Sequence, residues 1–171
     1  MKKTFYSEMA YICGIITIAL GTAFMERADY GVSMVVAPAY LVYLKISSFW
    51  PSFTFGMAEY SLQAILLLVL AVVMRSFKFK YLFSFVTAFI YGNVLDAALL
   101  LIGKIDGTSQ VTRGIYYVLG LFFCALGVSF FFHTYLSPEA YELFVKEISS
   151  RFGMDINKTK TIYDITSASI G

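Results

Sequence analysis

Residues 11–24 read Tyr-Ile-Cys-Gly-Ile-Ile-Thr-Ile-Ala-Leu-Gly-Thr-Ala-Phe, and residues 117–130 read Tyr-Val-Leu-Gly-Leu-Phe-Phe-Cys-Ala-Leu-Gly-Val-Ser-Phe. The stretches align without a gap and share identical residues at Tyr11/Tyr117, Gly14/Gly120, Ala19/Ala125, Leu20/Leu126, Gly21/Gly127 and Phe24/Phe130. Shorter echoes follow, with Pro38-Ala39-Tyr40 returning as Pro138-Glu139-Ala140-Tyr141 and Ile46-Ser47-Ser48 as Ile148-Ser149-Ser150. A repeat of this length in so apolar a chain predicts two related, membrane-embedded halves.

The composition places the chain in a membrane. Of its 171 residues, 59% are hydrophobic and only 14% are charged, whereas a soluble domain carries about 25% charged residues. The aromatic content of 18% suits rings placed at the two membrane–water interfaces. Cys13 and Cys124 fall inside apolar runs, so we interpret them as small packed hydrophobes and expect neither a disulfide framework nor a metal site.

Four stretches are long and apolar enough to cross a bilayer, which takes about 20 residues. They are roughly 9–25, 56–75, 80–102 and 113–133. The segment 34–46 is apolar but covers only about 20 Å as a helix, which is less than the hydrocarbon core. The segment 138–150 is predicted to be an interfacial amphipathic helix. Ser137 would cap it and Pro138 would begin it, with Tyr141, Phe144, Val145 and Ile148 on one face and Glu139, Glu142, Lys146 and Glu147 on the others.

The basic residues favour a topology in which neither short helix crosses the bilayer. With the N-terminus in the cytoplasm, the inner side then holds Lys2, Lys3, Arg75, Lys78, Lys80, Lys146, Arg151, Lys158 and Lys160, and the outer side holds Arg27, Lys45, Lys104 and Arg113. This bias follows the positive-inside rule, and a crossing at 34–46 would largely remove it. We therefore expect a multi-pass membrane protein with its N-terminus in the cytoplasm.

The expected fold class is all-α and polytopic, with two inverted repeats of three spans plus a short interfacial helix. Three crossings is an odd number, so the second unit must insert in the opposite orientation to the first. The repeats are residues 1–103 and 104–171, and the second is incomplete, since 157–171 matches only the start of the second span, with Tyr163 in the place of Tyr60. We expect the sequence to be a fragment of a longer chain that lacks the last spans.

Three stretches carry a family resemblance. They are Ala28-Asp29-Tyr30-Gly31-Val32-Ser33, Phe55-Gly56-Met57-Ala58-Glu59-Tyr60, and Tyr81 to Ala88 leading to Tyr91-Gly92-Asn93-Val94-Leu95-Asp96. They resemble the uncharacterised YczE-type bacterial membrane proteins, which are distantly similar to the YitT-like family. Here Met34 follows the Gly-Val-Ser directly, where family members have a proline soon after, and a further carboxy-terminal span is missing. The resemblance implies a multi-pass inner-membrane protein of two related halves and implies no particular activity.

Polar side chains within predicted spans are costly, at roughly 2.5–3.5 kcal/mol for a charge at the helix centre, so each needs a reason. Glu59 and Gln63 share one helix face, as do Asn93 and Asp96. Together with Arg113 and Asp164 of the second half, these residues are our candidate solute-binding set, with Arg113 or Arg27 neutralising Asp96 or Glu59. His133, the only histidine, is an alternative counterpart in the second half. The competing interpretation is interfacial residues close to water, or one ion pair that holds helices together.

Two functions remain open at this point. Duplicated, oppositely inserted halves with buried carboxyls favour a transporter or permease for a small solute. The absence of a dense polar core favours a membrane scaffold or accessory subunit. No phosphate-binding loop, zinc-ligand cluster or nucleophile elbow occurs in the sequence, so we predict no enzymatic activity and no cofactor. The expected partners are the lipid bilayer, a small-molecule solute, and a second copy or another membrane protein, but no nucleic acid.

Overall fold

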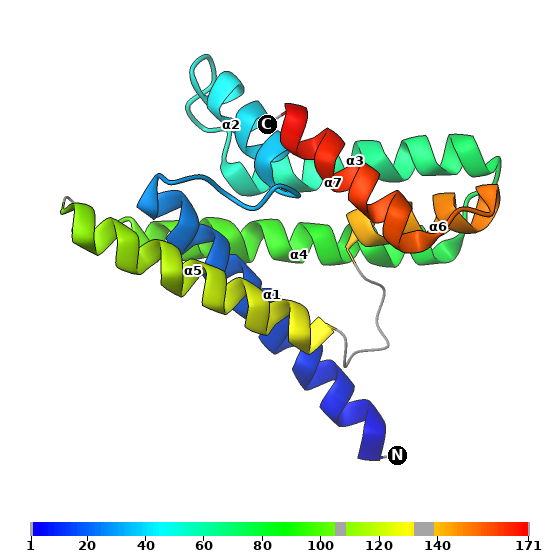
Figure 1. Ribbon diagram of the computed structural model, residues 1–171, viewed down its shortest axis with the longest axis horizontal. Helices are drawn as coiled ribbons and strands as arrows, with labels where there is room; N and C mark the ends of the chain where they lie inside the picture. The colour runs from blue at the N-terminus through cyan, green and yellow to red at the C-terminus, as the bar shows by residue number, and fades with distance from the viewer. Residues whose placement is uncertain (1, 105–108, 132–138, 171) are drawn as a thin grey trace. The chain divides into compact units, whose positions relative to one another are not determined.

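A computed structural model describes residues 2–104, 109–131 and 139–170. Within these residues it contains helices and no strand (Figure 1): α1 (Lys2–Ala28), α2 (Ala37–Ser47), α3 (Phe55–Met74), α4 (Phe79–Ile102), α5 (Gln110–Phe131), α6 (Ala140–Phe152) and α7 (Ile156–Ile170). Four of these helices are long and apolar enough to cross a membrane, namely α1 from Tyr6 onward, α3, α4 and α5. The all-α class and the four predicted spans are therefore confirmed, with boundaries shifted by a few residues.

The ends of the helices follow local rules. The Thr54 side chain caps α3 by accepting a hydrogen bond of 3.1 Å from the Met57 N–H, and Arg75 ends that helix with φ of 52°. α2 carries a proline in its first turn, where the missing N–H costs nothing. Gly153 ends α6 in the left-handed region, with φ of 64°. The N-cap of α6 is Glu139, whereas the predicted cap and first residue, Ser137 and Pro138, lie outside the described residues.

The chain divides into two compact units. The first consists of residues 1–33 and 91–136, which include α1, α5 and the second part of α4. The second consists of residues 34–90 and 137–171, which include α2, α3, α6, α7 and the first part of α4. These units differ from the predicted repeats 1–103 and 104–171, because each unit combines helices from both halves of the sequence.

In the first unit, α1 and α5 pack against each other (Figure 1). Their contact runs along two glycine stripes, which are Gly14 and Gly21 on α1 and Gly120 and Gly127 on α5. Gly14 lies opposite Gly127, and Gly21 lies opposite Gly120. Because the residue number rises along one helix as it falls along the other, the two helices run in opposite directions. A Cβ atom on Gly21 would lie 2.9 Å from the Gly120 carbonyl oxygen, so the two backbones approach as closely as helices can. The repeated glycines therefore allow the close packing of the two helices.

In the second unit, α6 packs against α3 and α7. Leu67 and Leu70 of α3, Tyr81 of α4, and Ala140 and Leu143 of α6 form a buried apolar cluster. The prediction of an interfacial helix with one apolar face was wrong in this respect, since Leu143, Glu147 and Ser149 are also buried. α6 is covered on two sides by neighbouring helices, and sequence periodicity reveals only the apolar part of such a surface.

Glu147 of α6 forms ion pairs with Lys78 and Lys80, which lie before and at the start of α4. Burial acts to raise the pKa of Glu147, but the hydrogen bonds from the two lysines outweigh it, so the pKa lies below the ordinary value of 4.5. A lowered carboxyl pKa adds stability that is present above the unfolded-state value and is lost as the pH falls through the folded-state value. The ion pairs should therefore hold α6 to α4 at neutral pH and release it in acid.

We expect Glu147→Gln to lower the melting temperature modestly at pH 7, because both lysine partners are partly exposed and their attraction is screened by water. The difference from the parent protein should shrink as the pH falls below 4.5. Circular dichroism melts of the detergent-solubilised chain across that range would measure it. Glu142→Gln, at an exposed position of the same helix, is the control. An equal effect of both substitutions at every pH would contradict the prediction.

Candidate functional site

Glu59 and Gln63 lie one turn apart on α3, and both have 0% of their surface exposed. The Gln63 amide donates a hydrogen bond of 3.2 Å to Oε1 of Glu59. The Gln63 carbonyl oxygen accepts a hydrogen bond of 3.1 Å from the backbone N–H of Ala140, at the start of α6. Gln63 therefore connects the carboxyl of Glu59 to one of the free N–H groups at the first turn of α6. The interpretation of Glu59 as an interfacial residue close to water does not fit this burial.

α6 supplies two further members of the site, Tyr141 and Glu139. The Tyr141 hydroxyl donates a hydrogen bond of 3.0 Å to Oε1 of Glu59. Burial, and then the charge of Glu59, raise the pKa of Tyr141, so its hydroxyl stays protonated and remains a donor. Glu139 makes no capping hydrogen bond to α6. Its burial raises its pKa to about 8, and the nearby charges of Glu59 and Glu142 add to that effect.

Several buried carboxyl oxygens of the second unit have no hydrogen-bond partner. They are Oε2 of Glu59, Oε1 of Glu139 and Oδ1 of Asp164. An unpaired buried polar group costs about 1–3 kcal/mol, so folded proteins keep few of them. We call Glu59, Gln63, Glu139 and Tyr141 the acidic site. The two unpaired glutamate oxygens in the acidic site are the atoms available to a proton or a solute.

The predicted residues Asn93, Asp96 and Arg113 belong to the first unit. Arg113 donates hydrogen bonds to the backbone oxygens of Ala28 and Asp29, at 2.8 and 3.1 Å, and forms an ion pair of 2.8 Å with the Asp29 carboxylate. It pairs with Asp29, so of the two arginines expected to neutralise Asp96 or Glu59, Arg27 is the one that stays a prediction. The alternative reading, an ion pair that holds helices together, describes Arg113 well, since it ties the end of α1 to the start of α5.

The other candidates divide by their exposure. Asp96 is half-buried and Asn93 is exposed, and both make interactions within the fold. Asp164 lies half-buried on α7, in the same unit as the acidic site. The structure thus brings Glu59 and Gln63 together with Tyr141 and Glu139, and their role in solute binding stays a prediction. His133 lies outside the described residues.

The sequence missed Glu139 because the residue was assigned to the polar face of an interfacial helix. One signal could have indicated it: Glu139 is inserted between the proline and the alanine of the echoed Pro-Ala-Tyr motif. An insertion beside an otherwise repeated motif marks a place where the two halves differ. The contact with α3 could not be read from that pattern, since it depends on how the helices pack.

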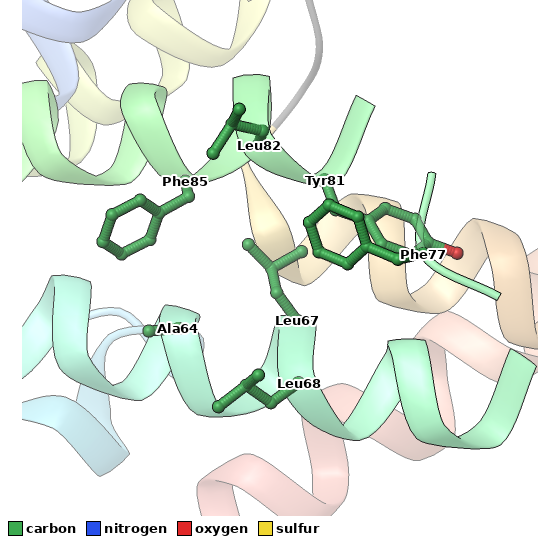
Figure 2. Close-up of a pocket in the computed structure, with 7 residues that line it drawn as sticks. All are labelled: Ala64, Leu67, Leu68, Phe77, Tyr81, Leu82 and Phe85. Carbon is green, nitrogen blue, oxygen red and sulfur yellow. The ribbon is translucent and has the colours of Figure 1, made fainter. Parts of the chain in front are cut away.

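A separate cavity of about 210 Å³ lies between α3 and the first part of α4 (Figure 2). Its lining is apolar apart from the Tyr81 hydroxyl, and comprises Ala64, Leu67, Leu68, Phe77, Tyr81, Leu82 and Phe85. In Figure 2 the Leu67 side chain points from α3 toward the rings of Phe85 and Tyr81 on α4. A site for a polar solute needs a few polar groups that fix its orientation. This cavity therefore suits hydrocarbon rather than a polar solute.

Among the described residues, no group of three or more histidine, cysteine, aspartate or glutamate side chains could hold a metal ion. The acidic site instead combines two carboxyls, an amide and a phenol, all of which can exchange hydrogen bonds with a small polar molecule or hold a proton. Carboxyls buried in a membrane-spanning bundle commonly mark ion and solute pathways. The class that the fold and this site define is a helical, multi-span membrane protein with a buried acidic site.

Residues 5–171 match a family of unknown function (DUF6198), and the chain belongs to that family. Comparisons with curated proteins and with solved structures gave no match. The family assignment adds no activity to the fold.

Proposed function

We propose that this protein carries a small solute across the bacterial inner membrane, with the acidic site as the place where the solute or its coupling ion binds. The observation that carries the proposal is the burial of Glu59. This residue has 0% of its surface exposed, and one of its carboxyl oxygens has no hydrogen-bond partner among the described residues. A charge-bearing group at such a position is expensive in a membrane span unless it serves a pathway. The kinship with YczE-type proteins, proposed from the sequence, is consistent with this role.

The packing of the helices supports the inverted repeat on which the proposal depends. In the repeat, α1, α2 and α3 correspond to α5, α6 and α7. When each helix is replaced by its counterpart, the contact between α2 and α3 becomes the contact between α6 and α7. In the same way, the contact between α3 and α6 becomes the contact between α7 and α2. All four contacts are present in the second unit, and α1 packs against its own counterpart in the first. A two-fold relation between inverted halves predicts this pattern.

Aromatic contacts in the second unit repeat in the same way. On α2, the rings of Tyr40 and Tyr43 lie 5.2 and 5.7 Å from the ring of Phe55, which begins α3. On α6, the rings of Tyr141 and Phe144 lie 6.2 and 6.0 Å from the ring of Tyr163 on α7. In both halves, two rings three residues apart on the short helix contact a ring of the next helix, although that ring is at a different position, since Tyr163 aligns with Tyr60 and not with Phe55. The paired rings of the short helices support a duplicated module, with alternating exposure of the acidic site as the transport mechanism.

Metabolite profiling of cells tests the proposal. Deleting the gene should change the level of a small solute inside and outside the cells, and the parent gene should restore it. Glu59→Gln should restore less than a tenth of the effect at equal membrane abundance, because removing a buried ionisable group from a pathway costs at least about 1.4 kcal/mol of function. Glu8→Gln makes the same chemical change at an exposed position of α1 and should behave as the parent.

A scaffold or accessory subunit is the second candidate. It is favoured by α5, of which only 17% is buried within the chain, compared with 28–39% for the other candidate spans. That helix leaves a broad apolar face for lipid or for another membrane protein. If Glu59→Gln restores the metabolite levels fully while a bulky polar substitution at exposed Val118 does not, the scaffold role is the better account.

A further inference from the structure

The acidic site contains two carboxyls, that of Glu59 on α3 and that of Glu139 at the start of α6, and Gln63 links the two places through its hydrogen bonds to Glu59 and to the Ala140 N–H. We infer that Glu59 and Glu139 together hold one exchangeable proton, so that the ion bound by this site is the proton. This inference deepens the proposed function and rests on it, since an exchangeable proton in the site would couple solute movement to a proton gradient.

Each carboxyl has one buried oxygen without a hydrogen-bond partner among the described residues: Oε2 of Glu59, which is fully buried, and Oε1 of Glu139, which is a half-buried residue. Glu59 accepts its hydrogen bonds at Oε1 only, from Gln63 and Tyr141. The charge of Glu59 is the second cause, after burial, of the raised pKa of Glu139. Two carboxylates that interact across an environment of low dielectric constant cannot both ionise easily, so they titrate as a pair.

Among the described residues, no positive side chain compensates the pair. Neither Glu59 nor Glu139 forms an ion pair within the part of the chain that the structure describes. The charged or titratable groups that act on the pair are Glu142 and Tyr141 of α6 and Tyr163 of α7, and the described part of α2 contributes none. All of these groups are acids, so none can neutralise a second negative charge. A buried charge without a partner is relieved by taking up a proton.

Glu139 is the member of the pair that holds the proton at neutral pH. Its pKa of about 8 keeps the carboxyl neutral at pH 7, and it makes no hydrogen bond that would stabilise the ionised form. Release breaks the O–H bond of Glu139, sends the proton to water or to the solute, and changes the charge of the pair from −1 to −2. The two donors, Gln63 and Tyr141, remain directed at Glu59 throughout.

A proton fits the site better than a metal cation. A bound cation needs several oxygen ligands arranged around it, and the described residues offer no cluster of three acidic, histidine or cysteine side chains. The Gln63 carbonyl oxygen already accepts a hydrogen bond from the Ala140 N–H, which leaves fewer free oxygens. Sodium is the alternative that the experiment must separate from a proton.

Infrared titration of the full chain tests the inference. In dodecyl maltoside micelles, which lack ester carbonyls, the carbonyl stretch of a protonated carboxylic acid should lose intensity as the pH rises through about 8. Glu139→Gln should abolish that step. Glu59→Gln should move the step to lower pH, because Glu139 then ionises without a like charge beside it. Glu8→Gln, at an exposed position, should leave the step unchanged.

Three results would overturn the inference. One is a step that survives Glu139→Gln, and another is a step whose midpoint does not respond to Glu59→Gln. The third is a midpoint that moves when sodium chloride replaces choline chloride at constant ionic strength, since the site would then bind sodium. No solute is present in this titration, so it can succeed even if metabolite profiling rejects transport, and it can fail while transport stands.

Discussion

Gly120→Ala, like the matching change at Gly127 on the same helix, should strongly destabilise the protein. A Cβ atom at this position would lie 2.8 Å from the Gly21 carbonyl oxygen, 3.0 Å from the Met25 nitrogen and 2.6 Å from the Met25 Cγ. Two of these three neighbours are backbone atoms of α1, so the helices must separate to make room. Overpacking of this kind costs about 1–3 kcal/mol, and we expect the upper part of that range.

The matched control is Gly114→Ala on the same helix. A Cβ atom on Gly114 would meet nothing within 4 Å, and alanine favours a helix over glycine by about 1 kcal/mol. The melting temperature of the detergent-solubilised chain should therefore fall by roughly 4–10 °C for Gly120→Ala and stay level or rise for Gly114→Ala. If both changes had the same effect, α1 and α5 would not be in contact along their glycines.

The glycine stripes were the part of the fold that the sequence predicted best. Gly14 and Gly21 recur as Gly120 and Gly127, and a stripe of small residues on an apolar helix indicates a close helix contact. The sequence could not say which helix is the partner. The structure pairs each stripe with the other, in opposite directions, because only two smooth surfaces allow both backbones to approach so closely.

The acidic site was half predicted. Glu59 and Gln63 were found because a polar pair one turn apart is conspicuous within an apolar span. Glu139 was assigned to the polar side of an interfacial helix and Tyr141 to its apolar face, because a short segment with apolar residues on one face and charges on the others is typical of a helix at the membrane surface. Their burial depends on α6 packing against both α3 and α7, which is a tertiary contact between segments far apart in the sequence. Periodicity within one helix contains no information about such a contact.

Gln63→Leu should be the most damaging substitution in the second unit. It removes the hydrogen bond to Glu59 and the acceptor of the Ala140 N–H, and both partners are 0% exposed. The Ala140 N–H loses its acceptor, which costs about 1–3 kcal/mol, whereas Glu59 keeps the bond from Tyr141 and the lost bond costs about 0.5–1.5 kcal/mol, so we expect a total of roughly 2–4 kcal/mol. Thermal or denaturant unfolding of the solubilised chain would measure the loss, and α6 should also become more accessible to proteolysis.

A double-mutant cycle with Glu59→Leu shows how much of that loss passes through the acidic site. In the Glu59→Leu background the carboxyl is gone, so Gln63→Leu leaves only the Ala140 N–H without a partner and should cost less by about 0.5–1.5 kcal/mol. Equal costs in both backgrounds would mean that Gln63 stabilises α6 alone and that Glu59 does not depend on it. Because the inferred proton is held beside the same carboxyl, a strong coupling between Glu59 and Gln63 would also mean that α3 and α6 cannot separate without changing the environment of that proton.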